Sequence, residues 1–189
     1  RNAILAAAEA GVPRVVYAST SGTIGVSRRS DDVLDEDDPY PLDIVRKWPY
    51  YLSKVYAEQA ALQASKDTGV EVVMVNPTLL LGPGDDRQSS TGDVLKFMRR
   101  QIPSVPSGGM SFVDVRDVAE LHWRALTAPQ RMADERFIAC GGFLWLREIA
   151  AILRAELGDQ ARKVPTLALP DWSVRLLARF SPTVRAAAS

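Results

Sequence analysis

The chain has 189 residues, of which 47% are hydrophobic and 24% are charged, a composition typical of a globular protein that buries a sizeable core. Basic and acidic residues both number 23, so no positive excess points to nucleic acid or to an anionic membrane surface. One histidine, one cysteine and no Cys-x-x-Cys pair exclude an internal disulfide and leave no cluster of metal ligands. We therefore expect a protein that binds neither nucleic acid, nor membranes, nor a metal.

The chain opens on an alanine-rich helical pattern that ends near Gly11, and no initiator methionine or apolar leader precedes this pattern. An opening inside a helix suggests a fragment of a longer protein. The segment 13–20, "PRVVYAST", is typical of a buried strand that ends in small hydroxyl residues. The acidic segment 28–43 is rich in turn formers, and we interpret it as a solvated surface loop.

Helix and strand patterns alternate after the acidic loop. Helices are predicted at 49–69, 91–102, 116–128 and 146–158, and strands at 71–77, 110–115 and 136–140. This alternation predicts an α/β fold, a parallel sheet with helices on its faces, in which ligands bind beyond the carboxyl ends of the strands. Those ends are "ASTSGTIG" at 18–25 and "NPTLLLGPG" at 76–84.

The only histidine and the only cysteine both fall in structural contexts. His122 lies in a helical pattern, where a structural role is expected. Cys140 ends the apolar segment "RFIAC", so we expect a buried thiol in a reducing compartment. This thiol is consistent with a cytoplasmic protein.

The glycines provide no phosphate-binding turn. A dinucleotide site needs a glycine-rich turn between a strand and a helix, where backbone N–H groups approach the pyrophosphate. The candidates are Gly22-x-x-Gly25 and "GPG" at 82–84, but neither has the three-glycine pattern and neither opens directly into a helix. If the protein binds a dinucleotide, the phosphate-binding half must precede Arg1.

Tyr50 and Lys54, in "PYYLSK", are the main candidates for chemistry. Residues four apart on a helix project from one face, so both side chains can reach the same ligand. A phenol with an ordinary pKa of about 10 is a poor acid or base near neutral pH, but a neighbouring ammonium stabilises its phenolate form. Because Tyr-x-x-x-Lys occurs by chance in many helices, the surrounding motifs decide its meaning.

In its motifs the chain resembles the extended short-chain dehydrogenase/reductase family, also called the NAD-dependent epimerase/dehydratase family. The matching segments, in the family's order, are "RVVYASTSGTIG", "PYYLSKVYAEQAA", "VNPTLLLGPG" and "SFVDVRDVAELHWRAL". They cover roughly residues 1–128, and the resemblance weakens after them. The resemblance implies the C-terminal half of a Rossmann-type doubly wound parallel sheet, with a smaller mixed substrate-binding domain.

The same resemblance implies domain boundaries and a cofactor. Residues 1–83 and 112–128 would form the C-terminal half of an NAD(P)-binding domain, and residues 84–111 and 129–189 an incomplete substrate-binding or lid region. The cofactor would be NADP or NAD, because the residue that selects between them is absent together with the glycine-rich turn. The chain by itself is therefore expected to bind cofactor poorly.

By resemblance, the catalytic residues are Thr20, Tyr50 and Lys54. Tyr50 would exchange a proton with the substrate oxygen, and Lys54 would stabilise its phenolate and hydrogen-bond the nicotinamide ribose. Tyr51 is the rival for the acid, but it has no lysine four residues later. Pro77, Thr78 and Leu79 would line the nicotinamide pocket, so the cofactor-binding residues are these three together with Tyr50 and Lys54.

Three hydroxyls compete to orient the substrate carbonyl: Ser19, Thr20 and Ser21. We choose Thr20 because the family's residue lies five before a glycine, which here is Gly25. If the strand geometry continues, the two serines point to the other side.

Details of these motifs indicate a branch of the family. Family dehydratases place Asp and Glu directly after the catalytic threonine, where this chain has Ser21 and Gly22. Many sugar-nucleotide epimerases use an asparagine to hold the diphosphate, and Leu79 takes its place here. By contrast, "NPTLLLGP" and Trp48 resemble dihydroflavonol reductases and cinnamoyl-CoA reductases.

The leading prediction is therefore an NAD(P)-dependent reductase of a small carbonyl substrate, in which Tyr50 protonates the developing alkoxide and Thr20 shares its charge. A nucleotide-sugar epimerase with the same trio and a non-catalytic dinucleotide-binding protein are the alternatives. Arg87, Arg99 and Arg100 could meet an anionic substrate, although surface arginines are common. A homodimer is compatible with the small residues on the Tyr-Lys helix, which permit close packing on the sheet or on a second copy: Ala57, Ala60, Ala61 and Ala64.

Overall fold

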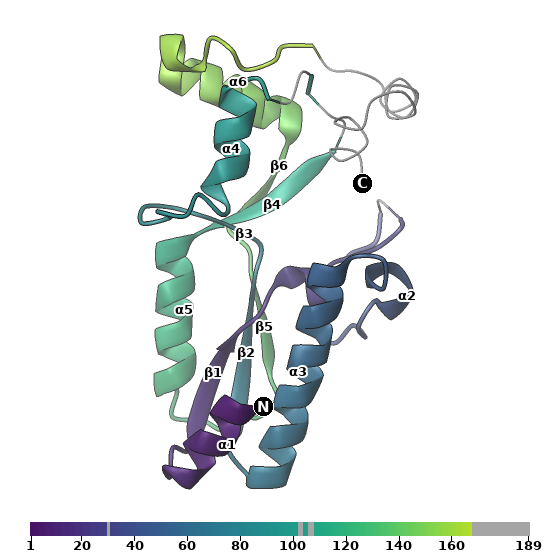
Figure 1. Cartoon of the computed structure of the whole chain (residues 1–189), viewed down its shortest axis with the longest axis vertical. Coiled ribbons are helices and arrows are strands. Elements are labelled where there is room, and N and C mark those ends of the chain that lie inside the picture. The colour runs from purple at the N-terminus through teal and green to yellow at the C-terminus, as the bar shows by residue number, and fades with distance from the viewer. Residues whose placement is uncertain (30, 102–103, 106–107, 168–189) are drawn as a thin grey trace. The chain divides into compact units, whose positions relative to one another are not determined.

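The computed structural model describes residues 1–29, 31–101, 104–105 and 108–167, and Figure 1 shows the elements they form. The chain divides into two compact units. Unit 1 consists of Arg1–Leu80 and Val113–Gly141, and unit 2 consists of Leu81–Phe112 and the residues from Gly142 on.

Unit 1 is built on a three-stranded parallel sheet. Its strands are β1 (Arg14–Ala18), β2 (Glu71–Pro77) and β5 (Arg136–Ala139), in the order β1-β2-β5. The register pairs Ala18 with Val75 and Pro77 with Ala139, so the carboxyl ends of all three strands lie at one edge. The predicted α/β fold with a parallel sheet is confirmed.

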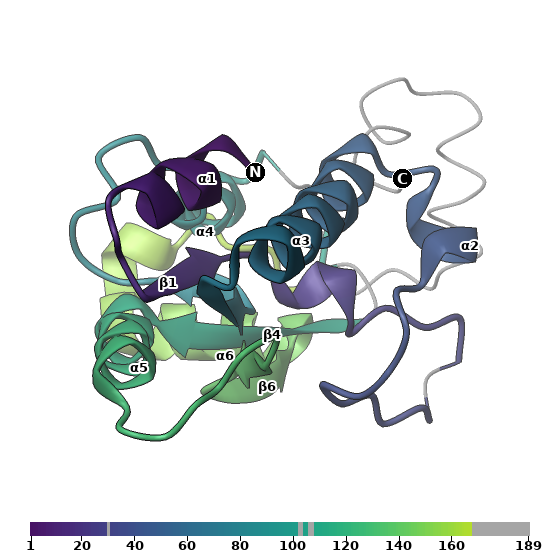
Figure 2. The same cartoon turned by 90° about the horizontal axis from the view of Figure 1, so that it is seen from below.

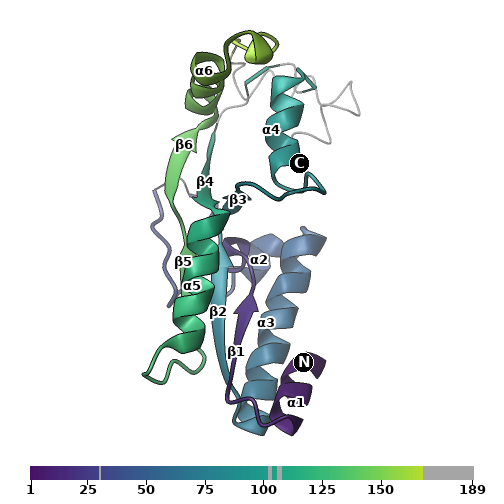
Figure 3. The ribbon, with the colours of Figure 1, turned by 90° about the vertical axis from the view of Figure 1, so that its left-hand side faces the viewer.

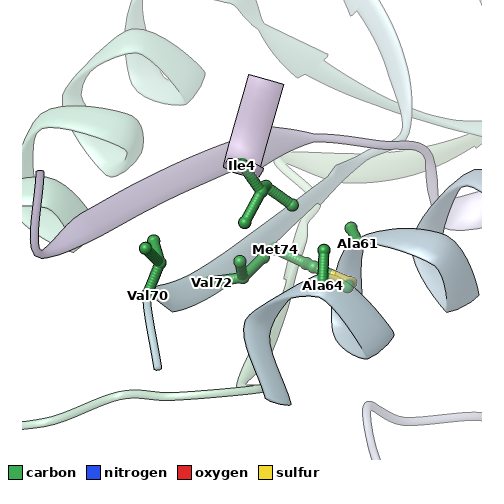
Figure 4. Close-up of a cluster of buried hydrophobic side chains, with 6 residues drawn as sticks. All are labelled: Ile4, Ala61, Ala64, Val70, Val72 and Met74. Carbon is green, nitrogen blue, oxygen red and sulfur yellow. The ribbon is translucent and has the colours of Figure 1, made fainter. Parts of the chain in front are cut away.

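Helices cover both faces of this sheet (Figures 2 and 3). On one face lie α1 (Asn2–Glu9) and α3 (Pro49–Thr68), and on the other lies α5 (Val115–Thr127). Successive residues of β2 point to opposite faces. One set of buried side chains therefore packs under α1 and α3, as Figure 4 shows: Ile4, Ala61, Ala64, Val70, Val72 and Met74.

The other face of β2 packs against α5. Val75 joins Val118 of this helix in one cluster, and Val73 joins Ala125 in another. A strand that is buried on both faces must be apolar at successive positions, which is why "VVMV" in β2 has no polar alternation. All four side chains of this "VVMV" segment are fully buried.

The helix α3 has the predicted limits. Pro49 occupies its first turn, where the missing N–H costs nothing, and Gly69 ends it in the left-handed conformation with φ of 77°. The shorter helical elements of unit 1 are η1 (Ser21–Thr23) and α2 (Leu42–Val45). Of the small residues on α3, Ala61 and Ala64 pack against the sheet of the same chain and are buried there.

The second sheet has the order β3-β4-β6, with β4 and β6 antiparallel. Its strands are β3 (Leu79–Leu81), β4 (Gly109–Asp114) and β6 (Gly142–Trp145). The helical elements of unit 2 are α4 (Thr91–Met98), α6 (Leu146–Leu157) and η2 (Gly158–Ala161). They enclose a separate core made of Phe97, Val105, Ala150, Ala161 and Val164.

The observed division differs from the sequence-based boundaries around β5. Those boundaries assign residues 129–189 to the substrate region, whereas β5 pairs with β2 and lies in unit 1. Residues 168–189 of that region lie outside the described residues. The predicted burial of Cys140 is wrong, because the strand ends at Ala139 and the thiol is exposed just beyond it.

Within the described part of the chain, no helix combines the length and the apolar character that crossing a bilayer requires. His122 Nδ1 lies 2.8 Å from the carbonyl oxygen of Val118, one turn earlier on α5.

Candidate functional site

Tyr50 and Lys54 lie on the same face of α3, one turn apart. The Lys54 Nζ is 5.8 Å from the centroid of the Tyr50 ring, and the tyrosine side chain is 60% exposed. An ammonium over the face of a phenol ring is attracted by the ring. The predicted pair is therefore formed in the folded chain, with its phenol open to a ligand.

Two further aromatic rings surround this phenol. The Tyr51 ring centroid lies 5.3 Å from that of Tyr50 in an edge-on arrangement and 5.8 Å from that of Trp48. Trp48 is the residue just before α3, and its side chain is 39% exposed. The first turn of α3 thus carries a group of three aromatic rings, one of which is the candidate acid.

Tyr51, the rival for the acid, has a packing role. A Cβ atom built on Gly22 would stand 2.0 Å from Cε1 of Tyr51, so the ring lies directly on the backbone of the η1 turn. The residue four positions after it is Val55, which is buried. This close approach requires glycine at position 22 and leaves no room there for the carboxylate of a dehydratase.

Thr20 stands where β1 turns into η1. It is the N-cap of that turn, and its Oγ1 accepts a hydrogen bond from the Gly22 N–H at 3.4 Å. The strand ends at Ala18, so the strand geometry assumed for the serines does not continue to Ser21, which lies in the turn. Ser19 is buried and donates to a carboxylate of α3, so its hydroxyl is not open to a ligand.

Pro77, Thr78 and Leu79 lie at the carboxyl end of β2 and the start of β3. Thr78 donates both its N–H and its hydroxyl hydrogen to the carbonyl oxygen of Ala139, at 3.0 and 3.2 Å. These bonds fasten the end of β2 to the end of β5. Thr78 therefore contributes the shape of the strand edge, and its two donors are already engaged.

A buried carboxylate that the motif reading did not single out lies beneath this edge. Glu58 is fully buried on α3, and its Oε1 accepts hydrogen bonds from Ser19 just after β1, from Thr23 in η1 and from Asn76 in β2. Its position four residues after Lys54 and eight after Tyr50 was visible in the sequence. Its burial was not, since a glutamate on a long helix is usually solvated.

The arginines proposed for an anionic substrate lie in unit 2. Arg99 lines an open pocket of about 580 Å³ between α4 and η2, together with Leu95, Met98, Arg162 and Lys163. Arg87 and Arg100 do not line it. Across the residues that the structure describes, no group of three or more His, Cys, Asp or Glu is placed to hold a metal.

Comparisons with known proteins agree with this architecture. The profile of the "NAD dependent epimerase/dehydratase family" matches residues 1–141. The chain is 36% identical over 178 residues to a Synechocystis protein named "Putative dihydroflavonol 4-reductase", covering 91% of this chain and 49% of that protein. It is 32% identical over 160 residues to cinnamoyl-CoA reductase 2 of Medicago truncatula, covering 81% and 47%. The chain thus spans about half the length of the curated relatives it matches.

Solved structures show the same similarity. The crystal structure of gox2253 aligns with a TM-score of 0.78 and 30% identity, over 99% of this chain and 55% of that one. UDP-glucose 4-epimerase of Thermus thermophilus in complex with NAD aligns with a TM-score of 0.66 and 26% identity, over 89% and 54%. The fold is common to proteins named as reductases and as epimerases, so the site has to distinguish the reactions.

Proposed function

The chain belongs to the NAD-dependent epimerase/dehydratase family, and we propose that the protein reduces a small aldehyde or ketone with NADPH or NADH. The observation that carries this proposal is the exposed Tyr50 phenol, with the Lys54 ammonium 5.8 Å from its ring, on the helix beside the strand ends. Similarity to proteins named dihydroflavonol 4-reductase and cinnamoyl-CoA reductase supports reduction over the other reactions of the family.

The residues at this edge fit the nicotinamide end of such a cofactor. Lys54 is half-buried and its ammonium can donate to ribose hydroxyls, while the half-buried Leu79 offers apolar contact beside the buried Pro77. The glycine-rich turn that would hold the diphosphate is not in this sequence. When bound, the reduced cofactor supplies the hydride.

Residues of the chain itself would transfer the proton to the substrate oxygen. The Tyr50 phenol donates its proton to the substrate oxygen as negative charge develops there, and the Lys54 ammonium stabilises the phenolate that remains. Thr20 accepts from Gly22 through its oxygen, so its hydroxyl hydrogen can donate to the same substrate oxygen. Positioning the carbonyl between these groups accounts for much of the expected acceleration.

The test uses the complete reading frame and follows reduced-nicotinamide absorbance with NADH or NADPH and a panel of aldehydes and ketones. Replacing Tyr50 by Phe removes the proton donor and should lower kcat by at least about 100-fold. Tyr56→Phe is the matched control, since Tyr56 lies on the same helix and is 58% exposed. It should leave turnover unchanged.

Two outcomes would contradict the proposal. Equal turnover by Tyr50→Phe and the unmodified protein would remove the tyrosine from the chemistry. Tight cofactor binding without net oxidation by any carbonyl would instead favour the redox-neutral epimerase or the non-catalytic reading.

A further inference from the structure

Glu58 is a buried ionisable group to which the proposed chemistry gives no task. Its side chain has no exposed surface, and none of the ion pairs between described residues includes it. Its Oε2 is buried and has no hydrogen-bond partner within the described residues. Burying a carboxylate in this way opposes folding, and an apolar side chain that filled the same space would often be equally or more stable.

Three donors converge on the other oxygen of Glu58. Tyr40 is a further neighbour, since burial, the charge of Glu58 and a hydrogen bond to it raise the pKa of the Tyr40 phenol. The Oε1 atom accepts from the Ser19 hydroxyl, from Thr23 Oγ1 at 2.8 Å and from Asn76 Nδ2 at 2.9 Å. These donors come from the end of β1, from η1 and from β2. One oxygen of α3 thus fastens together the three elements whose ends form the candidate site.

The same donors also hold the backbone of Thr20. The carbonyl oxygen of Thr20 lies 2.9 Å from Thr23 Oγ1 and 3.1 Å from Asn76 Nδ2. Asn76 Nδ2 is also 3.0 Å from Thr23 Oγ1, which closes the group. Two side chains that also contact Glu58 therefore face the carbonyl oxygen of Thr20. The two amide hydrogens of Asn76 can serve Thr20 and Glu58 together, whereas the single hydroxyl hydrogen of Thr23 goes to one of them at a time.

The helical spacing connects this group to the catalytic pair. Glu58 follows Lys54 by one turn of α3 and Tyr50 by two turns, so a rigid helix transmits its position to both. Glu58 also acts on a neighbouring phenol: burial raises the pKa of Tyr17, and the negative charge of Glu58 raises it further. Tyr17 thus lies within electrostatic range of Glu58.

We propose that Glu58 is a positioning residue that sets the place of the Thr20 hydroxyl relative to the Tyr50 phenol by binding Ser19, Thr23 and Asn76. This inference rests on the proposed reductase function, because the alignment matters only if both groups meet one substrate oxygen. The support for this inference is geometric. Thr20 and Tyr50 lie on separate elements, and Glu58 contacts residues of each neighbouring element where they meet.

The experiment compares Glu58→Leu and Glu58→Gln in the complete reading frame, with Gln59→Leu as a control on the exposed side of the same helix. Glu58→Leu should lower kcat on the order of 10-fold to 100-fold, as expected when reacting groups are displaced by about 1 Å, with a much smaller change in KM for the cofactor. Glu58→Gln keeps an acceptor oxygen and should recover most of kcat. The control should match the unmodified protein.

Hydrogen exchange gives a readout that does not depend on turnover. The amides of Thr23, Ile24 and Gly25 donate to the carbonyl oxygens of Thr20 and Ser21 and so close the η1 turn. Glu58→Leu should speed their exchange while the amides of β2 stay protected. If Glu58→Leu does not fold, Thr23→Val removes a single hydroxyl of the group and should show the same exchange pattern in milder form.

The outcomes separate the two proposals. If the unmodified protein reduces no carbonyl but η1 exchange still responds to Glu58→Leu, the reductase function fails and the positioning of the turn stands. Wild-type kcat and unchanged η1 exchange in Glu58→Leu would overturn the positioning role. A Glu58→Gln variant as impaired as Glu58→Leu would also overturn it, since hydrogen bonds to Oε1 would then not be what matters.

Discussion

The two sheets of the chain bury their strands in opposite ways. In unit 1, β2 is covered on both faces, and its residues from Val72 to Pro77 are all buried. In unit 2, β6 alternates between half-buried and exposed positions, and its exposed positions carry large aromatic rings. Phe143 and Trp145 are 52% and 44% exposed, with ring centroids 5.2 Å apart and the Arg147 guanidinium over the tryptophan.

This difference indicates where the chain can tolerate substitution of its side chains. A strand packed on both faces fixes the position of its carboxyl end, where the Thr20 and Pro77 segments are held. A strand with one open face can change its exposed side chains at little cost to stability, and thus can vary what it presents to a ligand. If this is so, substitutions in β2 should destabilise the protein much more than substitutions on the exposed face of β6.

The largest contrast is expected between core and exposed truncations. Met74→Ala removes a fully buried side chain from β2 and should lower the free energy of unfolding by about 2 to 5 kcal/mol. Phe143→Ala, at a half-exposed position of β6, should cost no more than about 1 kcal/mol. Denaturant unfolding of both variants measures the difference, and equal losses would break the comparison.

A tight glycine in unit 1 provides the second test. In Gly22→Ala the new Cβ would meet the Tyr51 ring at 2.0 Å, so the ring must move, at a cost of about 1 to 3 kcal/mol. Because the obstacle is a side chain, Gly22→Ala in a Tyr51→Ala background should cost much less. A double-mutant cycle of unfolding free energies measures this coupling.

Gly109 is the corresponding tight glycine of unit 2. Its Cβ would meet Cζ of Phe143 at 2.4 Å but also the carbonyl oxygen of Leu144 at 2.6 Å. Removing the Phe143 ring should therefore not rescue Gly109→Ala, because the Leu144 obstacle is backbone of the paired strand β6. Rescue by Phe143→Ala would show that the β4–β6 pairing yields more easily than we infer.

A smaller effect is expected at the end of α3. Gly69 has φ of 77° and open space around its Cα, so Gly69→Ala should lower stability by about 1 to 2 kcal/mol through backbone conformation alone. Its effect should be the same with or without Glu58→Gln, since Glu58 lies in the middle of α3 and Gly69 lies just beyond its C-terminal end. Thermal unfolding of the single and double variants measures this independence.

The smallest effect is a pH dependence in unit 2. Backbone N–H groups of Ser89 and Thr91 and the Thr91 hydroxyl donate to Asp85 and hold the pKa of its carboxyl well below the ordinary 3.8. Because the folded pKa is lowered, this carboxylate stabilises the fold above pH 3.8, and that contribution is lost as the pH falls further toward the folded value. Asp85→Asn should remove this dependence.

The measurement follows the denaturation midpoint of both proteins between neutral and acid pH. The difference between the unmodified protein and Asp85→Asn should shrink below pH 3.8. A constant difference across that range would mean that the loop contacts are not formed in solution.

Local patterns were sufficient for much of the fold and for part of the site. The contact between the Tyr50 and Lys54 side chains follows from four-residue spacing on a helix, which is a local property. Pro49 and Gly69 marked the ends of α3 for equally local reasons, a missing donor at the start and a left-handed residue at the end. The alternation of strands and helices predicted the parallel sheet.

Contacts between distant segments had no such local signal. The place of β5 beside β2 depends on pairing across the sheet, which is why the sequence-based boundary put its residues in the other region. The exposure of Cys140 depends on where that strand stops, not on its apolar neighbours. The end of β1 at Ala18 likewise could not be read from the β-branched run before it.

The sequence by itself predicted the strands of the parallel sheet, the limits of α3 and the spacing of Tyr50 and Lys54, because these follow from patterns within one segment. It did not predict α2, β3 or β6. Only the tertiary structure decided that Glu58 is buried. Its partners Ser19, Thr23 and Asn76 lie 39, 35 and 18 residues away along the chain. A charged side chain becomes a buried anchor only when such distant donors meet it, and folding alone brings them together.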